Sequence, residues 1–172
     1  MLESKEEAYL LLQELGANKR LITHLRLVGE AAELLIGIFK ELSVPIDEKY
    51  IELGVAVHDA GKIVHTLELD NPGGEHEPEG EKLLLANGVD PKIARCCKSH
   101  ARFMEMEVTL EELVVALSDK LWKGKRESEL ELMVIDRAAS TIGKERWDIF
   151  TELDSKFEEI AAGGVYRLDR SK

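Results

Sequence analysis

Apolar residues recur at every third or fourth position along most of the chain, which is the spacing that predicts amphipathic helices. The predicted helices span residues 4–15, 18–41, 47–58, 76–87, 90–99, 127–142 and 144–161, with one more that begins after Thr109. Residues that favour helix starts precede several of them, namely Ser4, Asp47 and Asp90, and Thr109-Leu-Glu-Glu112 matches a capping box. We therefore expect an all-α fold, a bundle of helices.

The breaks in this pattern are short, with one exception at residues 65–75. That segment contains Asn71-Pro-Gly-Gly74, a strong turn signal, and loops of this kind often shape functional sites. Gly163-Gly164 ends the last predicted helix, so we expect residues 165–172 to be loosely held. No linker is long or polar enough to divide the chain, which predicts a single domain over residues 1–172.

Four histidines and two aspartates stand out, because most of them occupy positions where a helix should bury apolar side chains: His24, His58, Asp59, His76, His100 and Asp119. Taken singly, each has a plain explanation, either a core histidine bonded to a backbone carbonyl or an aspartate paired with a lysine or arginine. Burying several such groups without partners would cost roughly several kcal/mol. Side chains that converge from separate helices need a shared partner, and a metal ion is the simplest one.

The adjacent pair His58-Asp59 supplies an imidazole and a carboxylate to one place. Because neighbouring residues do not share a helix face, such a pair works best where a helix ends. Gly61 follows it directly and is interpreted as the stop signal of that helix.

Read together, these residues resemble the HD-domain superfamily of metal-dependent phosphohydrolases. The core pattern of that family, H…HD…D, is matched by His24, His58-Asp59 and Asp119. Val57-His58-Asp59-Ala60-Gly61-Lys62 is similar to the HD-x-G-K turn of the family, and residues 23–32 resemble its first-ligand helix. The resemblance covers about residues 20–125, and the helices over 127–161 follow this motif-bearing core.

Two further elements resemble one subgroup of that superfamily, which has two additional histidines between HD and the final aspartate. His76-Glu-Pro-Glu-Gly80 looks like its H-x-x-x-G element, and His100 fits the second histidine. The nearest analogues are stand-alone hydrolases of nucleotides or dinucleoside polyphosphates. No GYP-type signature follows the HD pair, which disfavours the cyclic-di-GMP phosphodiesterases that carry one.

The resemblance implies a central metal site with one or two divalent ions. A first ion would be held by His24, His58, Asp59 and Asp119, and a second by His76 and His100 with Asp59 as the bridge. The mixture of imidazoles and carboxylates suits iron, manganese, cobalt, nickel or zinc better than magnesium, which prefers oxygen ligands. Such ions acidify water for attack on phosphorus. In this reading Asp59 orients the nucleophile and Lys62 neutralises a phosphate oxygen.

Other basic residues are weaker candidates for substrate binding. Lys98 and Arg102 flank His100, and Lys123 belongs to a basic cluster next to Asp119 that also contains Lys120, Lys125 and Arg126. The alternative for this cluster is an ordinary solvated helix end, where cations also favour the helix dipole. His65 is interpreted as a loop histidine. Trp122 and Phe103 are candidates for stacking on a base, although core packing is the more common role.

The composition restricts the partners. The formal net charge is -11, which speaks against duplex nucleic acid and anionic membranes but not against a small phosphate ester at a metal site. Cys96 and Cys97 are adjacent, so no ordinary disulfide is expected, and both are interpreted as small core residues. The first seven residues are acidic and unlike a signal peptide, which favours a cytoplasmic location. A homodimer is compatible with the apolar helices.

The leading hypothesis is therefore a metal-dependent phosphohydrolase acting on a small-molecule phosphate, a nucleotide or dinucleotide. It would be a phosphomonoesterase, a phosphodiesterase or a dinucleoside-polyphosphate hydrolase. One alternative is a non-catalytic HD domain that binds a nucleotide in a regulatory role, although such domains usually lose ligands. Another is a purely structural metal site, whose removal by a chelator would unfold the protein. The sequence names neither the substrate nor the metal.

Overall fold

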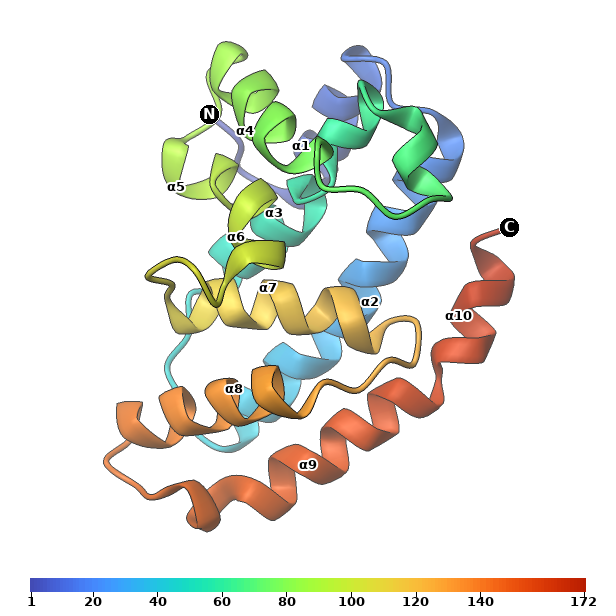
Figure 1. Cartoon of the computed structure of the whole chain (residues 1–172). Coiled ribbons are helices and arrows are strands. Elements are labelled where there is room, and N and C mark those ends of the chain that lie inside the picture. The colour runs from blue at the N-terminus through green and yellow to red at the C-terminus, as the bar shows by residue number, and fades with distance from the viewer.

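The computed structural model describes all 172 residues, and every regular element in it is a helix (Figure 1). The all-α prediction is thus confirmed. The elements are α1 Lys5–Glu14, α2 Lys19–Glu41, α3 Glu48–Val57, the 3-10 turns η1 Ala60–Ile63 and η2 Thr66–Leu69, α4 His76–Ala86, α5 Pro91–Ala94, α6 Cys96–Arg102, α7 Leu110–Leu121, α8 Ser128–Thr141, α9 Arg146–Ala162 and α10 Gly164–Arg170.

The predicted helix starts form the expected caps. The side chains of Ser4, Asp47 and Asp90 accept hydrogen bonds from backbone N–H groups in the first turns of α1, α3 and α5. Thr109 and Glu112 form a complete capping box at the start of α7. Each cap satisfies donors that have no partner within the helix and is worth about 1 kcal/mol.

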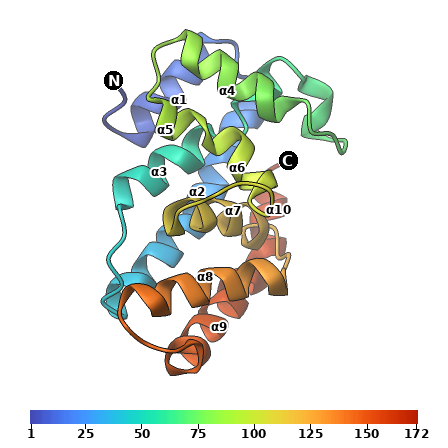
Figure 2. The same ribbon diagram turned by 60° about the vertical axis from the view of Figure 1, so that its left-hand side comes forward.

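The long helix α2 runs along most of the molecule, and the other elements pack around it in two groups (Figures 1 and 2). Helices α1 and α3 to α5, with the N-terminal part of α2, bury a smaller apolar core. The rest of α2 packs with α7, α8 and α9 around a larger one. Helix α2 serves both, since Leu25 belongs to the smaller core and Val28 to the larger. The predicted polar cluster lies where the two cores meet.

Two glycines allow α4 to lie directly on η1. A Cβ on Gly61 would stand 1.8 Å from the backbone oxygen of His76, and one on Gly80 would stand 2.8 Å from the backbone nitrogen of Gly61. Gly61 has no positive φ, so its interpretation as a helix stop signal is corrected: it is needed for close packing. This contact brings His76 next to the end of α3.

The C-terminal tail differs from the prediction that residues 165–172 are loosely held. Residues Gly164–Arg170 form α10, because the buried guanidinium of Arg167 donates to the carbonyls of Ile160 (2.9 Å) and Trp122 (3.0 Å). A Cβ on Gly164 would stand 2.4 Å from the nitrogen of Gly124, so this glycine is a contact point as well as a break. The tail is therefore anchored beside the end of α7.

Two smaller differences concern the middle of the chain. The helix predicted over 90–99 is divided into α5 and α6, and α6 extends to Arg102. The predicted loop 65–75 is present but contains the turn η2. None of the helices combines the length and apolar character needed to cross a lipid bilayer.

Candidate metal centre

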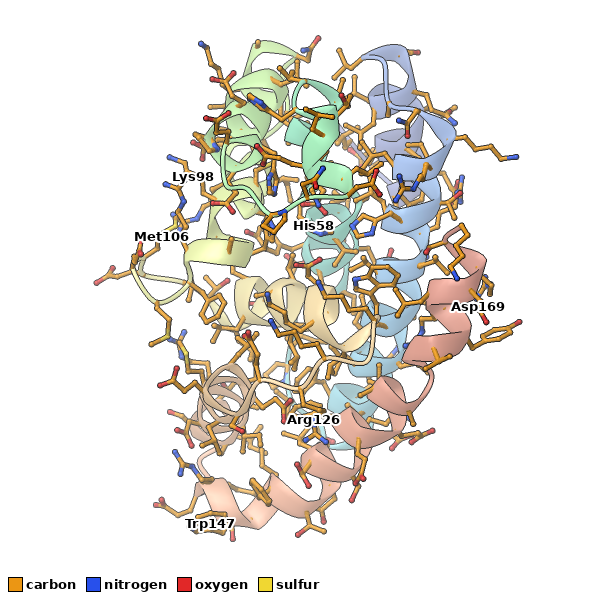
Figure 3. All side chains as sticks on the ribbon, turned by 45° about the vertical axis from the view of Figure 1, so that its right-hand side comes forward. His58, Lys98, Met106, Arg126, Trp147 and Asp169 are labelled. Carbon is orange, nitrogen blue, oxygen red and sulfur yellow. The ribbon has the colours of Figure 1, made fainter.

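A first group of candidate ligands joins three parts of the chain. The ligand atoms of His24 from α2, His58 and Asp59 at the end of α3, and Asp119 from α7 all lie within 4.8 Å of one another. The Nε2 atom of His24 is 2.8 Å from Oδ2 of Asp59, and the Nε2 atom of His58 is 3.2 Å from Oδ1 of Asp119. Figure 3 shows His58 in the middle of the bundle, where it is fully buried.

A second group shares Asp59 with the first. His76 opens α4 and His100 lies on α6, and their Nε2 atoms are 3.3 Å and 3.5 Å from Oδ1 of Asp59. The ligand atoms of Asp59, His76 and His100 also lie within 4.8 Å of one another, and all three side chains are buried. The two oxygens of Asp59 thus face different groups, Oδ2 toward His24 and Oδ1 toward His76 and His100.

The outer ring nitrogens orient three of the histidines. Nδ1 of His58 donates to the carbonyl of Val55 (2.6 Å), and Nδ1 of His100 donates to the carbonyl of Cys96 (2.9 Å). Nδ1 of His76 bonds instead to Oε1 of Glu68, at 2.6 Å. Because carbonyl and carboxylate oxygens accept, each Nδ1 carries the hydrogen and each Nε2 faces the centre, as in metal-ligating histidines.

Two buried atoms of the cluster, Oδ1 of Asp59 and Nε2 of His76, lie 3.3 Å apart but form no hydrogen bond. Unpaired buried polar atoms are rare in folded proteins, because desolvation without a partner is costly. A divalent cation between them would satisfy both. The donor set, four imidazoles and two carboxylates, also suits such a cation. The residues present therefore fit a metal centre.

Without a metal ion, the closely spaced imidazoles and carboxylates shift one another's pKa values. Burial opposes the charged form of His58, but the charge of Asp59 and the hydrogen bond to Asp119 outweigh it and raise the pKa of His58 to about 10. Burial likewise opposes ionisation of Asp59, yet the charge of His58 and the hydrogen bond from His24 hold the pKa of Asp59 well below its usual range. Burial and the nearby His58 charge lower the pKa of His100.

The cluster opens into a cavity of about 680 Å³. The walls come from the loop 65–75, the end of α7 and α10, and they carry five cations: Arg20, Lys62, Lys120, Lys123 and Lys125. The same lining also contains five carboxylates, those of Asp59, Glu68, Asp70, Glu77 and Asp119. Positive charge therefore prevails only at the end of α7, where Lys123 is exposed, and ions held by the two ligand groups would add to it in favour of an anionic ligand.

The predicted substrate-binding residues divide between the cavity and its surroundings. Lys62 lines it, with Nζ 3.1 Å from Oδ2 of Asp59, and so does the exposed Lys123. Lys98 and Arg102 do not line it; they pair with Glu81 (3.0 Å) and Glu77 (2.9 Å), and Lys98 lies at the outer edge of the molecule in Figure 3. Because Glu77 lines the cavity, Arg102 lies directly behind its wall, and a contact of Lys98 or Arg102 with substrate phosphate stays a prediction.

The aromatic candidates are placed differently from one another. Trp122 is 5% exposed and packs edge-on against His24, with 5.0 Å between the ring centroids, while it also lines the cavity. Phe103 does not line the cavity and packs against the larger core. His65 pairs with Glu75 at 3.5 Å and belongs to neither ligand group around Asp59. With Glu68 and Glu75 it forms a third, more exposed group whose ligand atoms lie within 4.8 Å of one another.

Sequence reasoning missed Glu68, which contacts His76, and the contribution of α10. Leu168 and Ser171 line the cavity, although they belong to the tail that was expected to be loose. Arg20 was missed too; it lines the cavity and forms an ion pair with Asp70. The one sequence signal for Glu68 is that it is an acidic residue close to the candidate ligand His76. Because the loop contains several acidic residues, this signal does not single out Glu68.

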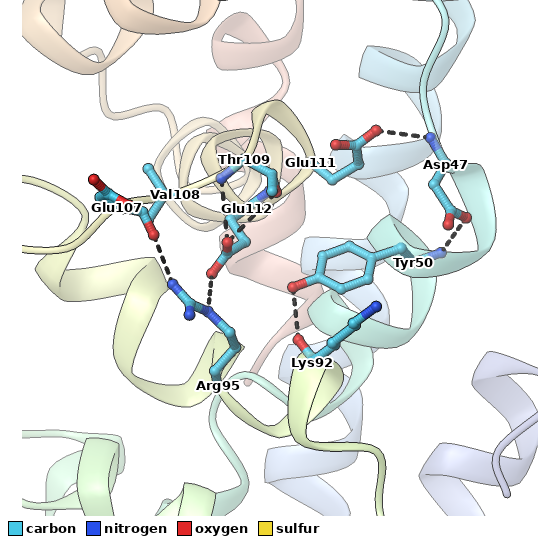
Figure 4. A pocket seen from close by; sticks show the side chains of 9 residues that line it. All are labelled: Asp47, Tyr50, Lys92, Arg95, Glu107, Val108, Thr109, Glu111 and Glu112. Atoms are coloured by element: carbon cyan, nitrogen blue, oxygen red, sulfur yellow. Dashed lines mark hydrogen bonds and ion pairs between the residues drawn. The ribbon is translucent and has the colours of Figure 1, made fainter.

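A second cavity of about 660 Å³ lies between α3, α5 and the start of α7 (Figure 4). Its buried polar groups have partners within the protein: Arg95 donates to Glu112 (2.8 Å) and to the carbonyl of Glu107 (2.7 Å), and the Tyr50 hydroxyl donates to the carbonyl of Lys92 (2.7 Å). It contains none of the unpartnered buried atoms. We therefore find no demand for a ligand there.

Comparison with known proteins agrees with the geometry. The family model described as HD domain matches residues 21–138, which include all six candidate ligands. No curated protein and no solved structure matches the chain. The matched region is more than half of the 172 residues. The chain therefore belongs to the HD-domain family, a family generally of metal-dependent phosphohydrolases.

Proposed function

We propose that the chain hydrolyses a phosphate ester or anhydride of a nucleotide or dinucleotide. The observation that carries the proposal is the sharing of Asp59 between two groups of candidate ligands beside one cavity that Lys62 and Lys123 also line. Two buried atoms of these groups form no hydrogen bond in the protein alone, which favours ion binding.

The proposed ligand sets follow the two groups: His24, His58, Asp59 and Asp119 for one divalent ion, and Asp59, His76 and His100 for another. Their imidazole content favours iron, manganese, cobalt, nickel or zinc over magnesium. An ion of this class acidifies water and polarises phosphoryl oxygens, which supplies the nucleophile and part of the charge neutralisation. This arrangement corresponds to the subgroup with two additional histidines.

The chain itself contributes orientation and charge. Asp59 sets the spacing of the two ligand groups, because each of its oxygens faces one of them. The side chain of Lys62 is 15% exposed, so its ammonium is held at the reacting end of the cavity. We assign Lys62 to neutralising a non-bridging phosphate oxygen, which stabilises the charge that develops in phosphoryl transfer.

The cavity supports a substrate larger than inorganic phosphate. Its volume of about 680 Å³ falls in the range of small-molecule sites, roughly 300–1,000 Å³. Apolar side chains of Leu69, Pro72, Trp122 and Leu168 share the walls with the cations. A phosphate at the ligand groups would thus leave room for a nucleoside along the wall, with Lys123 near any further phosphate.

The experiment is a hydrolysis screen of the full chain loaded in turn with Mn²⁺, Fe²⁺, Co²⁺, Ni²⁺ or Zn²⁺. Nucleoside monophosphates, dinucleoside polyphosphates and cyclic dinucleotides cover the three classes of phosphate bond. We expect turnover of at least one class. Absence of turnover with every ion would contradict the proposal and favour the regulatory alternative, in which a nucleotide binds without being cleaved.

A pair of variants tests the assignment of Asp59. Asp59→Ala is expected to lose about a thousandfold in kcat/KM, because several kcal/mol of metal-dependent stabilisation disappear. Asp136→Asn is the control, since Asp136 pairs with Arg146 on the surface. It should retain wild-type turnover. Activity that survives Asp59→Ala would show that catalysis does not use this residue.

A further inference from the structure

We propose that Glu68 is a positioning residue for His76, and that binding of an ion by the group Asp59, His76 and His100 depends on it. The inference rests on the proposed function, in which this group holds an ion. Its basis is geometric: Oε1 of Glu68 accepts from Nδ1 of His76 at 2.6 Å and from the backbone nitrogen of the same residue at 3.2 Å.

His76 needs an external acceptor because of its place in its helix. His58 and His100 donate to carbonyls three and four residues earlier, so their own helical backbone orients them. His76 is the first residue of α4, and no preceding turn of that helix offers such a carbonyl. The loop supplies the acceptor instead, through Glu68 on η2.

The loop is built around the Glu68 side chain, which is 12% exposed. A Cβ on Gly73 would stand 2.7 Å from Cδ of Glu68, so the backbone of the loop closes directly over the carboxylate. Arg20 of α2 pairs with Asp70 at the end of η2, and the amide of Asn71 donates to the carbonyl of Leu67 (2.9 Å). These contacts hold the acceptor in one place.

The two ligand groups therefore differ in what orients them. A carboxylate that accepts from the outer nitrogen fixes the tautomer of a ligating histidine and makes its inner nitrogen a stronger metal ligand. Loss of such a carboxylate typically weakens metal binding by about 10–100-fold. No residue of the group His24, His58, Asp59 and Asp119 bonds to Glu68. A change at Glu68 should weaken one ion and leave the other unchanged.

The test is titration of the metal-free full chain with Co²⁺, read by calorimetry and by the visible absorption of the bound ion. We expect Glu68→Ala to bind one ion within about twofold of wild type and the other about 10–100-fold more weakly. The affinity of Glu68→Gln for the weakened ion should fall between those of wild type and Glu68→Ala, because the glutamine amide oxygen still accepts a hydrogen bond but carries no charge. This variant also carries the test if Glu68→Ala fails to fold.

Glu75→Gln is the matched control, because Glu75 lies in the same loop, is exposed and pairs with His65. It should bind both ions as wild type does. Wild-type binding of both ions by Glu68→Ala and Glu68→Gln, or equal weakening of both, would overturn the proposal. Equal losses in Glu75→Gln and Glu68→Ala would overturn it too, because they would place the ion at His65, Glu68 and Glu75.

The proposed function and this inference fail in different ways. Wild-type protein that binds both ions without hydrolysing any substrate would contradict the function and leave the role of Glu68 standing. Wild-type protein that hydrolyses substrate with a single bound ion would overturn the role of Glu68 and leave the hydrolase assignment intact.

Discussion

The two cavities of this protein have nearly the same volume and are both lined by charged residues, yet their polar groups behave differently. Around the second cavity Arg95, Glu112 and Tyr50 find partners within the protein. Around the metal centre Asp59 and His76 each retain a buried atom that forms no hydrogen bond. Unsatisfied polar groups, rather than volume, therefore distinguish a ligand site from a gap between helices.

The origin of the charges explains the difference. Glu112 is in the second cavity because it completes the capping box of α7, and Arg95 offsets its charge. The charges of the metal centre come from four helices and the turn that follows α3, and no helix end requires them. The first set stabilises the fold by itself, whereas we propose that a cation completes the second set.

The largest effect is expected from closing the space that brings His76 to Asp59. Gly61→Ala would place a methyl group 1.8 Å from the His76 carbonyl, so α4 must move or the chain must unfold. We expect a loss of more than about 3 kcal/mol in the free energy of unfolding, measured by chemical denaturation.

Gly37→Ala is the control for that variant, because a Cβ at Gly37 meets no atom within 4 Å. Because Gly37 lies within α2, the alanine should stabilise the protein by about 0.5–1 kcal/mol. A Gly61→Ala protein as stable as wild type, with both ions bound, would show that α4 does not need this close contact.

Metal removal should have the next largest effect. An ion at about 100 times its dissociation constant stabilises the folded state by roughly 2.7 kcal/mol, which a chelator should abolish. The apolar cores do not depend on the ion, so the chelated protein should keep its helical circular dichroism and melt at a lower temperature. Unfolding by the chelator at room temperature would instead indicate a structural metal site.

A mutation at the second cavity should change the stability of the protein but not its metal affinity. Arg95→Ala leaves the carboxylate of Glu112, which is 3% exposed, without its guanidinium partner. We expect a loss of about 1–3 kcal/mol, reduced toward the lower value by the partial exposure of Arg95. Metal affinity should match wild type in the same titration. A loss of metal binding in this variant would contradict the separation of the two cavities.

The smallest effect is a pH dependence confined to the metal centre. Folding raises the pKa of His58 from 6.5 to about 10, so its stabilisation of the metal-free protein is complete below pH 6.5 and is lost as the pH rises through 10. A cation must displace that proton, so its affinity should rise with pH, by up to about tenfold per pH unit for each displaced proton.

Calorimetric titration between pH 6.5 and 8 in buffers of different ionisation enthalpy measures both the affinity and the protons released. Affinity that stays constant over this range would contradict protonation of His58. The second cavity should show no comparable change, because burial raises the pKa of Tyr50 and the bond to Glu112 raises that of Arg95, away from this range.

Much of this architecture could be predicted from the sequence, because local rules govern it. The caps at Ser4, Asp47 and Thr109 depend on residues a few positions away, and apolar spacing predicts the helices. The polar residues on apolar helix faces could also be grouped from the sequence. A single buried histidine or aspartate has no evident partner within its own helix, but several of them on different helices can share one.

What the sequence did not reveal depends on contacts between distant segments. The tail forms α10 because Arg167 reaches the carbonyl of Trp122, 45 residues away in the chain. The need for glycine at position 61 arises from α4, and no local rule indicates that Glu68 rather than Glu75 meets His76. Lys98 and Arg102 flank His100 in the sequence, yet neither lines the cavity: Lys98 pairs with Glu81, and Arg102 pairs with Glu77 of the cavity wall.

The most direct test of the account is a crystal structure of the Mn²⁺- or Zn²⁺-loaded protein with anomalous diffraction data at the absorption edge of the ion. The account predicts two anomalous peaks roughly 3.5–4 Å apart, one on each side of the Asp59 carboxylate. Peaks absent from this place, or found only beside His65 and Glu75, would contradict it.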